Sequence, residues 1–365
     1  MREIDAAVVR GPEEHAVEAV TLDDPESGEV LVDVRATGVC HTDYHAYTSE
    51  RTDFPIVLGH EGAGVVEAVG DGVSTVEPGD RVVLWVLPSC GDCEYCRSGR
   101  PYLCQARRET RGRMMDGTRR LGRDGKAINH FYAQSSFASM AVVPERQVIP
   151  VPDEVPFEIG ALLGCGVTTG LGAVSNITEV GSGESVAVFG CGGVGAGAVL
   201  AANAVSAGPI VAVDLDADTL ETMAEIGATH TVDAGDEDPV AEIEALTGGV
   251  DYAFECIGTP QTVQQAVASL GPGGTAAITG TSSTPPAEID LGQFTKGISV
   301  VGNIVGFTQP RVDIPRYAAM YQNGDLDLET ILTRRYELDE LDEAFAALDA
   351  GEGIRSVVRF DEGAH

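Results

Sequence analysis

Short runs of β-branched and apolar residues, separated by glycine-rich turns, fill the first 160 residues of the chain. Residues 30–34 (VLVDV) and 64–69 (GVVEAV) alternate or cluster such side chains, which is typical of strands. A turn signal at 77–80 (EPGD) precedes another strand-like run at 81–84 (RVVL). The pattern predicts that this first part is rich in β-structure.

Near residue 160 the pattern changes, and strand-like runs begin to alternate with helical segments. We expect strands at 185–189, 210–213, 251–254 and 274–279, with helices at 196–206 and 218–226. Alternation of this kind predicts a parallel, doubly wound sheet and therefore an α/β fold. Beyond residue 300 the regularity weakens, and we expect helices at 318–323 and 338–348 and a last strand at 356–360.

The charge balance excludes some classes of partner. The chain has 57 acidic and 23 basic residues, and its formal net charge is −34. Such a surface repels nucleic acids and anionic membranes, so we expect neither as a partner. It is typical of a protein kept soluble in high salt, which screens self-repulsion, and this favours a salt-loving source.

The N-terminus shows no signal peptide pattern, and no apolar stretch reaches the roughly 18 residues of a membrane span. We therefore expect a cytoplasmic protein. In a reducing compartment, eight cysteines favour metal binding or catalysis over disulfides.

Four cysteines form the most specific local motif: Cys90, Cys93, Cys96 and Cys104. Thiolates at this spacing can close a tetrahedral shell around Zn²⁺ and leave no open position, which predicts a structural site. An iron–sulfur cluster is the alternative, because iron also accepts four thiolates. A zinc ribbon that binds nucleic acid is disfavoured, since the segment has no basic stripe.

Three further candidate ligands lie apart in the sequence. They are Cys40 in GVCHTD, His60 in GHEG and Cys165 in GCG. Two cysteines and one histidine form the ligand set of a zinc ion that keeps its fourth position open. Such an ion is a Lewis acid that lowers the pKa of a bound hydroxyl, so an alcohol is the expected substrate.

A glycine-rich turn predicts a dinucleotide site. Residues 190–195 (GCGGVG) follow an expected strand and precede an alanine-rich helix, which is the context that G-x-G-x-x-G requires. The glycines let a pyrophosphate approach the helix N-terminus. Asp214 ends the next strand, and 215–219 contain no Arg or Lys. A carboxylate there favours NAD over NADP, although NADP stays open.

Residues 59–73 (GHEGAGVVEAVGDGV) resemble the zinc signature of the medium-chain dehydrogenases. Together with the cysteine motifs and the glycine-rich turn, the whole chain resembles the zinc alcohol dehydrogenases. The resemblance implies a GroES-like catalytic domain over 1–166, with a structural zinc lobe at 88–106. It further implies a Rossmann coenzyme domain over 167–299 and a return to the catalytic domain over 300–365.

The resemblance also implies roles for residues near the catalytic zinc. Thr42 would accept the substrate proton and His45 would pass it outward, a task that suits an imidazole. Asp43 would orient the His60 ring, and Glu61 would lie close behind the zinc and assist ligand exchange. A helix N-terminus is the alternative explanation for Thr42 and Asp43.

For the cofactor, the resemblance places His41 and Arg355 on the pyrophosphate and Thr169 and Val194 on the nicotinamide. The complete expected set is His41, Thr169, Gly190, Gly192, Gly193, Val194, Gly195, Asp214 and Arg355.

The chain is therefore expected to hold two zinc ions and NAD, and to interconvert alcohols, primary ones first, with aldehydes or ketones. A thiol-adduct formaldehyde dehydrogenase is the alternative, and a non-catalytic NAD(H) sensor is disfavoured by Thr42 and His45. Residues 114–139 resemble an insertion found in dimeric relatives. We expect a homodimer, with a tetramer left open.

Overall fold

The computed structural model describes residues 1–280 and 286–360 and divides into two compact units. The first unit comprises Met1–Cys165, Gln309–Gln322 and Leu332–His365, and the second comprises Gly166–Thr308 and Asn323–Ile331. Each unit is described by itself below.

The boundaries differ from the expected ones at the C-terminal side. Residues 300–308 and 323–331 group with the second unit, whereas a boundary at 299 assigned them to the first. The strand β16 (Ser299–Gly302) accounts for part of this difference, because it extends the sheet of the second unit.

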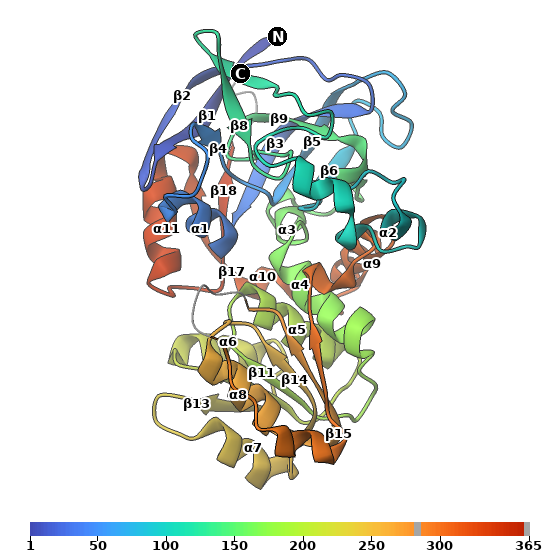
Figure 1. The fold of residues 1–365 in the computed structure, drawn as a ribbon, viewed down its shortest axis with the longest axis vertical. Coiled ribbons are helices and arrows are strands. Elements are labelled where there is room, and N and C mark those ends of the chain that lie inside the picture. Colours follow the sequence, from blue (N-terminus) through green and yellow to red (C-terminus); the bar gives the residue numbers. More distant parts are fainter. Residues whose placement is uncertain (281–285, 361–365) are drawn as a thin grey trace. The chain divides into compact units, whose positions relative to one another are not determined.

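The first unit contains a closed five-stranded barrel (Figure 1). Its strands, in spatial order, are β1 (Arg2–Gly11), β2 (Glu14–Leu22), β7 (Leu121–Arg123), β8 (Lys126–His130) and β4 (Ile56–Val57). Its buried apolar residues form one cluster with residues of the flanking helices. In that cluster the rings of Tyr47 and Phe345 stack at 4.7 Å between their centroids.

A seven-stranded sheet forms the rest of the β-structure in this unit. In spatial order it contains β10 (Val148–Pro150), β6 (Arg81–Leu84), β5 (Gly62–Val69), β3 (Glu29–Val39), β18 (Arg355–Arg359) and β17 (Leu332–Glu337), and β9 (Met140–Pro144) also pairs with β3. Strand β3 is buried along almost its whole length, although its sequence includes polar residues such as Asp33 and Thr37. It ends directly before Cys40 and thereby positions the first candidate ligand.

Five α-helices of the first unit are short to medium in length. They are α1 (His41–Thr48), α2 (Glu94–Arg97), α3 (Phe157–Leu162), α9 (Pro310–Gln322) and α11 (Leu341–Asp349). Across both described ranges, no helix is both long and apolar enough to cross a membrane.

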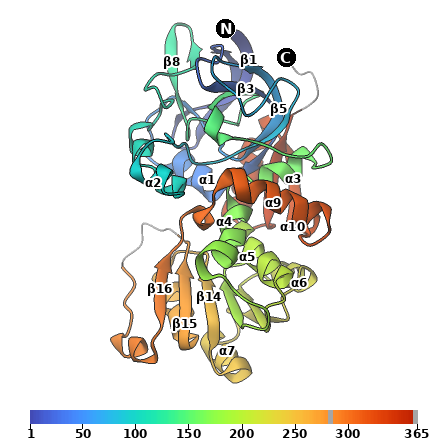
Figure 2. The same cartoon turned by 90° about the vertical axis from the view of Figure 1, so that its right-hand side faces the viewer.

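The second unit is a parallel six-stranded sheet, and Figure 2 shows three of its strands side by side. The spatial order is β13 (His230–Asp233), β12 (Ile210–Asp214), β11 (Val186–Phe189), β14 (Val250–Glu255), β15 (Leu270–Ile278) and β16. All five neighbouring pairs are parallel. The expected doubly wound α/β sheet is confirmed.

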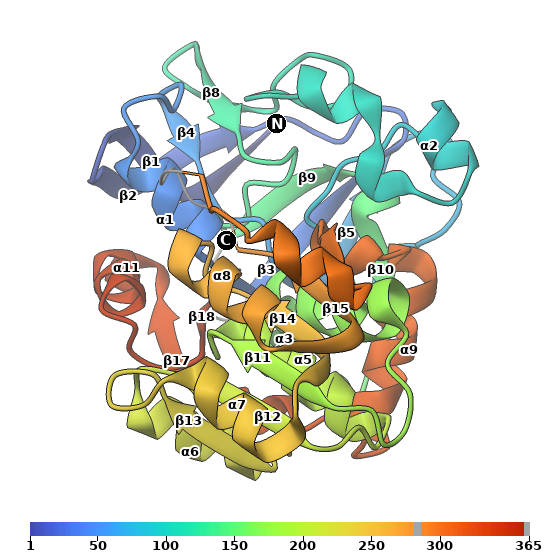
Figure 3. The ribbon, with the colours of Figure 1, turned by 60° about the horizontal axis from the view of Figure 1, so that its bottom comes forward.

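Helices cross between these strands. They are α5 (Gly193–Ala204), α6 (Ala217–Glu225), α7 (Pro239–Thr247) and α8 (Pro260–Ala268), with α4 (Gly166–Gly172) and α10 (Leu328–Ile331) completing the unit (Figure 3). Strand order reverses at β11, because β12 lies on one side of it and β14 on the other. Ligands of such sheets bind beside this switch point, at the carboxyl ends of the strands.

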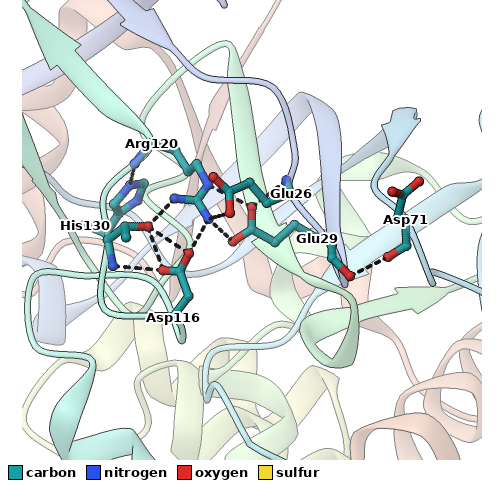
Figure 4. A network of polar contacts seen from close by, with 8 residues as sticks. Glu26, Glu29, Asp71, Asp116, Arg120 and His130 are labelled. Atoms are coloured by element: carbon teal, nitrogen blue, oxygen red, sulfur yellow. Dashed lines mark hydrogen bonds and ion pairs between the residues drawn. The ribbon is translucent and has the colours of Figure 1, made fainter.

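A buried ionic network ties the barrel to the neighbouring sheet (Figure 4). Arg120, whose side chain is 3% exposed, donates from Nε and Nη2 to the two oxygens of Glu29, each at 2.8 Å. Nη2 also reaches Asp116 Oδ2 at 2.6 Å, and the Arg120 backbone N–H donates to His130 Nε2 at 2.9 Å. Burial lowers the pKa of His130 to about 3, so this imidazole accepts as the neutral form.

We predict that Arg120→Met destabilises the first unit by about 3–5 kcal/mol, because it leaves the buried Glu29 carboxylate without its partner. The measurement is the unfolding midpoint in denaturant at fixed salt. Arg2→Met is the matched control: it removes the same charge from an exposed pair with Glu67 and should cost about 1 kcal/mol or less. Equal losses in the two variants would mean that net charge, and not the buried pair, sets the effect.

Candidate active site and metal centres

Four side chains from three separate segments of the first unit converge on one point. Cys40 follows β3 and is the N-cap residue of α1, His60 and Glu61 precede β5, and Cys165 follows α3. One ligand atom from each lies within 4.8 Å of those of the other three. The structure thus brings together the three predicted ligands of the catalytic zinc and Glu61, which the resemblance placed close to them.

Asp43 holds this cluster in place. It is completely buried, and its Oδ1 lies 3.0 Å from His60 Nδ1 and accepts from the Gly59 N–H at 2.9 Å. Its Oδ2 accepts from the Cys40 N–H at 3.3 Å. Asp43 is thus the N3 residue of the capping box at the start of α1 and also contacts the His60 ring; its role in orienting a zinc ligand stays a prediction.

The buried His60 Nε2 makes no hydrogen bond. Because Asp43 accepts at Nδ1, the imidazole presents the bare Nε2 lone pair to the side of the two cysteines. An unsatisfied buried acceptor next to two thiols fits a metal ion, which would take that lone pair. Gly59 allows the required turn, since its φ of +90° is one that side chains rarely adopt.

The two thiols share one environment. Hydrogen bonding from Cys165 holds the pKa of Cys40 well below its ordinary range, and the same contact, with burial, raises the pKa of Cys165. A lowered pKa favours the thiolate form of Cys40, which is the form that ligates metal.

Glu61 forms a buried ion pair with Arg355 at the start of β18. Burial raises the pKa of Glu61 to about 7, even though Arg355 acts in the opposite direction. Gly38 lies against this pair, and a side chain there would occupy the space of the Glu61 carboxylate. The ion pair was not foreseen from the sequence. The expected pyrophosphate contact of Arg355 stays a prediction.

The predicted proton path lies on α1. Thr42 is half-buried and comes two residues after Cys40 in the sequence. His41 and His45 are exposed and lie one helical turn apart, with their ring centroids 6.2 Å from each other. The roles of Thr42 and His45 in proton transfer stay predictions.

The four cysteines of the lobe also converge. Sγ of Cys93 and Sγ of Cys96 are 3.6 Å apart, and those of Cys90 and Cys104 are 3.5 Å apart. A tetrahedral zinc with bonds of about 2.3 Å would set sulfurs about 3.8 Å apart, so the spacing fits. Backbone N–H donors of Cys96 and Gln105 lower the pKa of Cys93 to about 6, which favours a thiolate.

The glycine-rich turn of the second unit joins β11 to α5. Gly190 has a φ of +87°, Gly192 is the N-cap, and Gly193, Val194 and Gly195 begin the helix. A side chain at Gly195 would strike the carbonyl of Gly190. No side chain caps this helix, so its first N–H groups fit an anionic ligand.

Asp214 and Thr169 lie in the same unit. Asp214 Oδ2 accepts from the Cys191 N–H at 2.7 Å, and Oδ1 accepts from Leu215 N–H at 2.7 Å. Asp214 thus ties the end of β12 to the glycine-rich turn. Thr169 is buried in α4. The remaining expected cofactor contacts, His41 and Arg355, belong to the first unit.

Comparison with known proteins gives matches along most of the chain. The family model for the alcohol dehydrogenase GroES-like domain matches residues 26–153, and that for zinc-binding dehydrogenases matches residues 193–322. An S-(hydroxymethyl)glutathione dehydrogenase of Escherichia coli O1:K1 is 40% identical over 350 residues, which are 92% of this chain and 94% of that protein.

Solved structures agree with this match. An alcohol dehydrogenase zinc-binding domain protein from Burkholderia ambifaria superposes with a TM-score of 0.95 at 37% identity, over 99% of this chain and 100% of that one. Benzyl alcohol dehydrogenase from Acinetobacter calcoaceticus gives a TM-score of 0.94 at 34% identity with the same coverage.

These findings define a two-unit zinc dehydrogenase with a GroES-like barrel and a Rossmann-type sheet. The chain belongs to the zinc-containing alcohol dehydrogenases of the medium-chain family. It is an NAD(P)-dependent oxidoreductase with a four-cysteine structural zinc site and a second, catalytic zinc site at the cysteine–histidine–glutamate cluster.

We predict that Cys93→Ser reduces the zinc content from two ions per chain to one and lowers the melting temperature, because α2 itself has no buried side chain to hold the lobe without the metal. Elemental analysis and thermal unfolding are the measurements. Cys256→Ser is the control, since Cys256 belongs to neither cluster, and it should keep both ions.

Proposed function

We propose that this enzyme oxidises primary alcohols reversibly to aldehydes, with NAD as the hydride acceptor. The observation that carries the proposal is the Cys40–His60–Cys165 cluster, in which the buried His60 Nε2 has no hydrogen-bond partner. Such a ligand set leaves one zinc position open to a substrate oxygen. When bound, the zinc supplies Lewis acidity that lowers the pKa of the alcohol hydroxyl.

The chain's own residues then move the proton. The Thr42 hydroxyl accepts the proton from the alcohol oxygen, and His45, one turn further along α1, hands it to solvent. When bound, NAD⁺ would supply the hydride acceptor for the carbon that bears the hydroxyl, and the alcohol would thereby become an aldehyde. Asp43 keeps the His60 ring oriented throughout, through its contact with Nδ1.

Asp214 supports the choice of NAD. Its oxygens already accept backbone N–H groups at the end of β12, and a carboxylate there repels a 2′-phosphate. His41 and Arg355 are proposed to contact the pyrophosphate, and Thr169 and Val194 the nicotinamide.

A thiol-adduct formaldehyde dehydrogenase is the second candidate, because the curated relative acts on S-(hydroxymethyl)glutathione by its name. The net charge of −34 weighs against an anionic glutathione adduct. Aromatic side chains favour an uncharged substrate: the rings of Phe131 and Tyr132 lie 5.6 and 5.5 Å from that of His60.

We also propose a homodimer that pairs through the edge strand β16. Leu291 and Phe294, which precede this strand, are 79% and 43% exposed. The acidic composition leads us to propose a salt-loving source, so the assays below use molar salt.

The test of function is an initial-rate panel of benzyl alcohol, ethanol and S-(hydroxymethyl)glutathione with NAD and with NADP at molar salt. We expect turnover of the free alcohols without thiol, and a higher kcat/KM with NAD because the Asp214 carboxylate repels a 2′-phosphate; a tenfold preference would correspond to about 1.4 kcal/mol. Rates that require the thiol adduct would support the second candidate, and equal rates with NADP would contradict the role of Asp214.

We predict that Cys40→Ser lowers kcat by at least about 10³-fold, because Lewis acidity contributes several kcal/mol to transition-state stabilisation. Binding of NADH, measured by fluorescence titration, should be unchanged, because the cofactor turn lies in the second unit. Full turnover in the variant would rule out the proposed catalytic centre.

A further inference from the structure

The segment 131–137, which follows β8, has an unusual backbone. Tyr132, Ala133 and Ser135 have φ values of 52°, 54° and 60°, in the left-handed region that non-glycine residues rarely adopt. Strain of this kind persists where the surroundings hold it, and it gathers near functional sites. We call this segment the 131–137 loop.

The loop is bonded to the segment that carries His60. Four of its hydrogen bonds reach residues 57–62: Ser135 Oγ to Val57 O at 2.8 Å, Phe137 N to Leu58 O at 3.0 Å, Ser136 N to Gly59 O at 3.1 Å, and Gly62 N to Gln134 Oε1 at 2.9 Å. Backbone atoms on both sides of His60 are therefore fixed by one loop.

Two rings of the loop also contact the imidazole. Phe131 lies edge-on to His60 with centroids 5.6 Å apart, and Tyr132 is tilted against it at 5.5 Å. Asp43 fixes the ring through Nδ1, so these rings limit its rotation about that contact.

Gln134 is the side chain that completes this support. It is 1% exposed, and both ends of its amide are used: Oε1 accepts from the Gly62 N–H, and Nε2 donates to Trp85 O at 3.4 Å. We propose that Gln134 is a positioning residue for the catalytic zinc, because it fixes the backbone immediately after His60 and Glu61. The inference rests on the proposed catalytic site.

Loss of the amide would have a local consequence. The buried Gly62 N–H would lose its acceptor, which is unfavourable for a buried donor, and residues 60–62 would shift to find another. A shift changes where His60 Nε2 points. Partners that orient metal ligands typically contribute 10–100-fold to metal affinity.

The experiment measures zinc retention and not turnover. Wild type, Gln134→Met, Gln134→Glu and Gln147→Met are dialysed at molar salt against graded concentrations of a zinc chelator, and zinc per chain is determined by elemental analysis. Methionine matches glutamine in length without its polar atoms, and glutamate keeps an oxygen for the Gly62 N–H. Gln147 is a buried amide that bonds Trp85 O at 2.9 Å and Tyr132 O at 3.1 Å but does not contact Gly62.

We expect Gln134→Met to lose one of its two zinc ions at a chelator activity about 10–100-fold lower than wild type, and to keep the lobe ion. Gln134→Glu and Gln147→Met should retain both ions as wild type does. Unchanged retention in Gln134→Met, or equal loss in Gln147→Met, would overturn the inference. A wild type that holds only the lobe ion would instead refute the proposed catalytic site.

Should Gln134→Met not fold, Gln134→Glu and Gln134→Asn decide the matter. Asparagine is too short to reach the Gly62 N–H, so it should release the catalytic zinc where glutamate does not. Equal retention by these two variants would refute the role of Gln134.

Discussion

The catalytic centre depends on one buried carboxylate. Asp43 accepts hydrogen bonds from the N–H groups of Cys40 and Gly59 and contacts His60 Nδ1. An unpaired carboxylate inside a protein is costly, so these groups must remain where they are for the folded state to be stable. Two ligands that are 20 residues apart in the sequence are thereby held together before any metal arrives.

The two metal centres obtain their geometry in different ways. At the catalytic centre, His60 and Glu61 are completely buried, and strands β3 and β5 fix them. At the lobe, α2 has no buried residue, and short turns alone connect the cysteines. The packing of the protein therefore orders the first site before metal binds, whereas metal binding itself supplies much of the free energy that orders the lobe.

Short sequence patterns correctly predicted the elements that depend on neighbouring residues alone. The strand–helix alternation and glycine-rich turn indicated β11, α5 and β12 to within a few residues, and cysteine spacing indicated the lobe. The helix expected at 318–323 is the end of α9, which begins at Pro310, because Pro315 interrupts the helical pattern in the sequence without ending the helix. No short sequence pattern indicates the Glu61–Arg355 ion pair or the hydrogen bond from Gly62 N–H to Gln134, because each joins segments that are far apart in the sequence.

The partner of Glu61 comes from the far end of the chain, 294 positions later. During synthesis from the N-terminus, the barrel and its cysteines emerge long before β18. Until β18 pairs with β3, the Arg355 guanidinium is not beside Glu61, and burial of the Glu61 carboxylate is unfavourable. A variant that lacks β18 would therefore retain every candidate zinc ligand but would lack the guanidinium that pairs with Glu61.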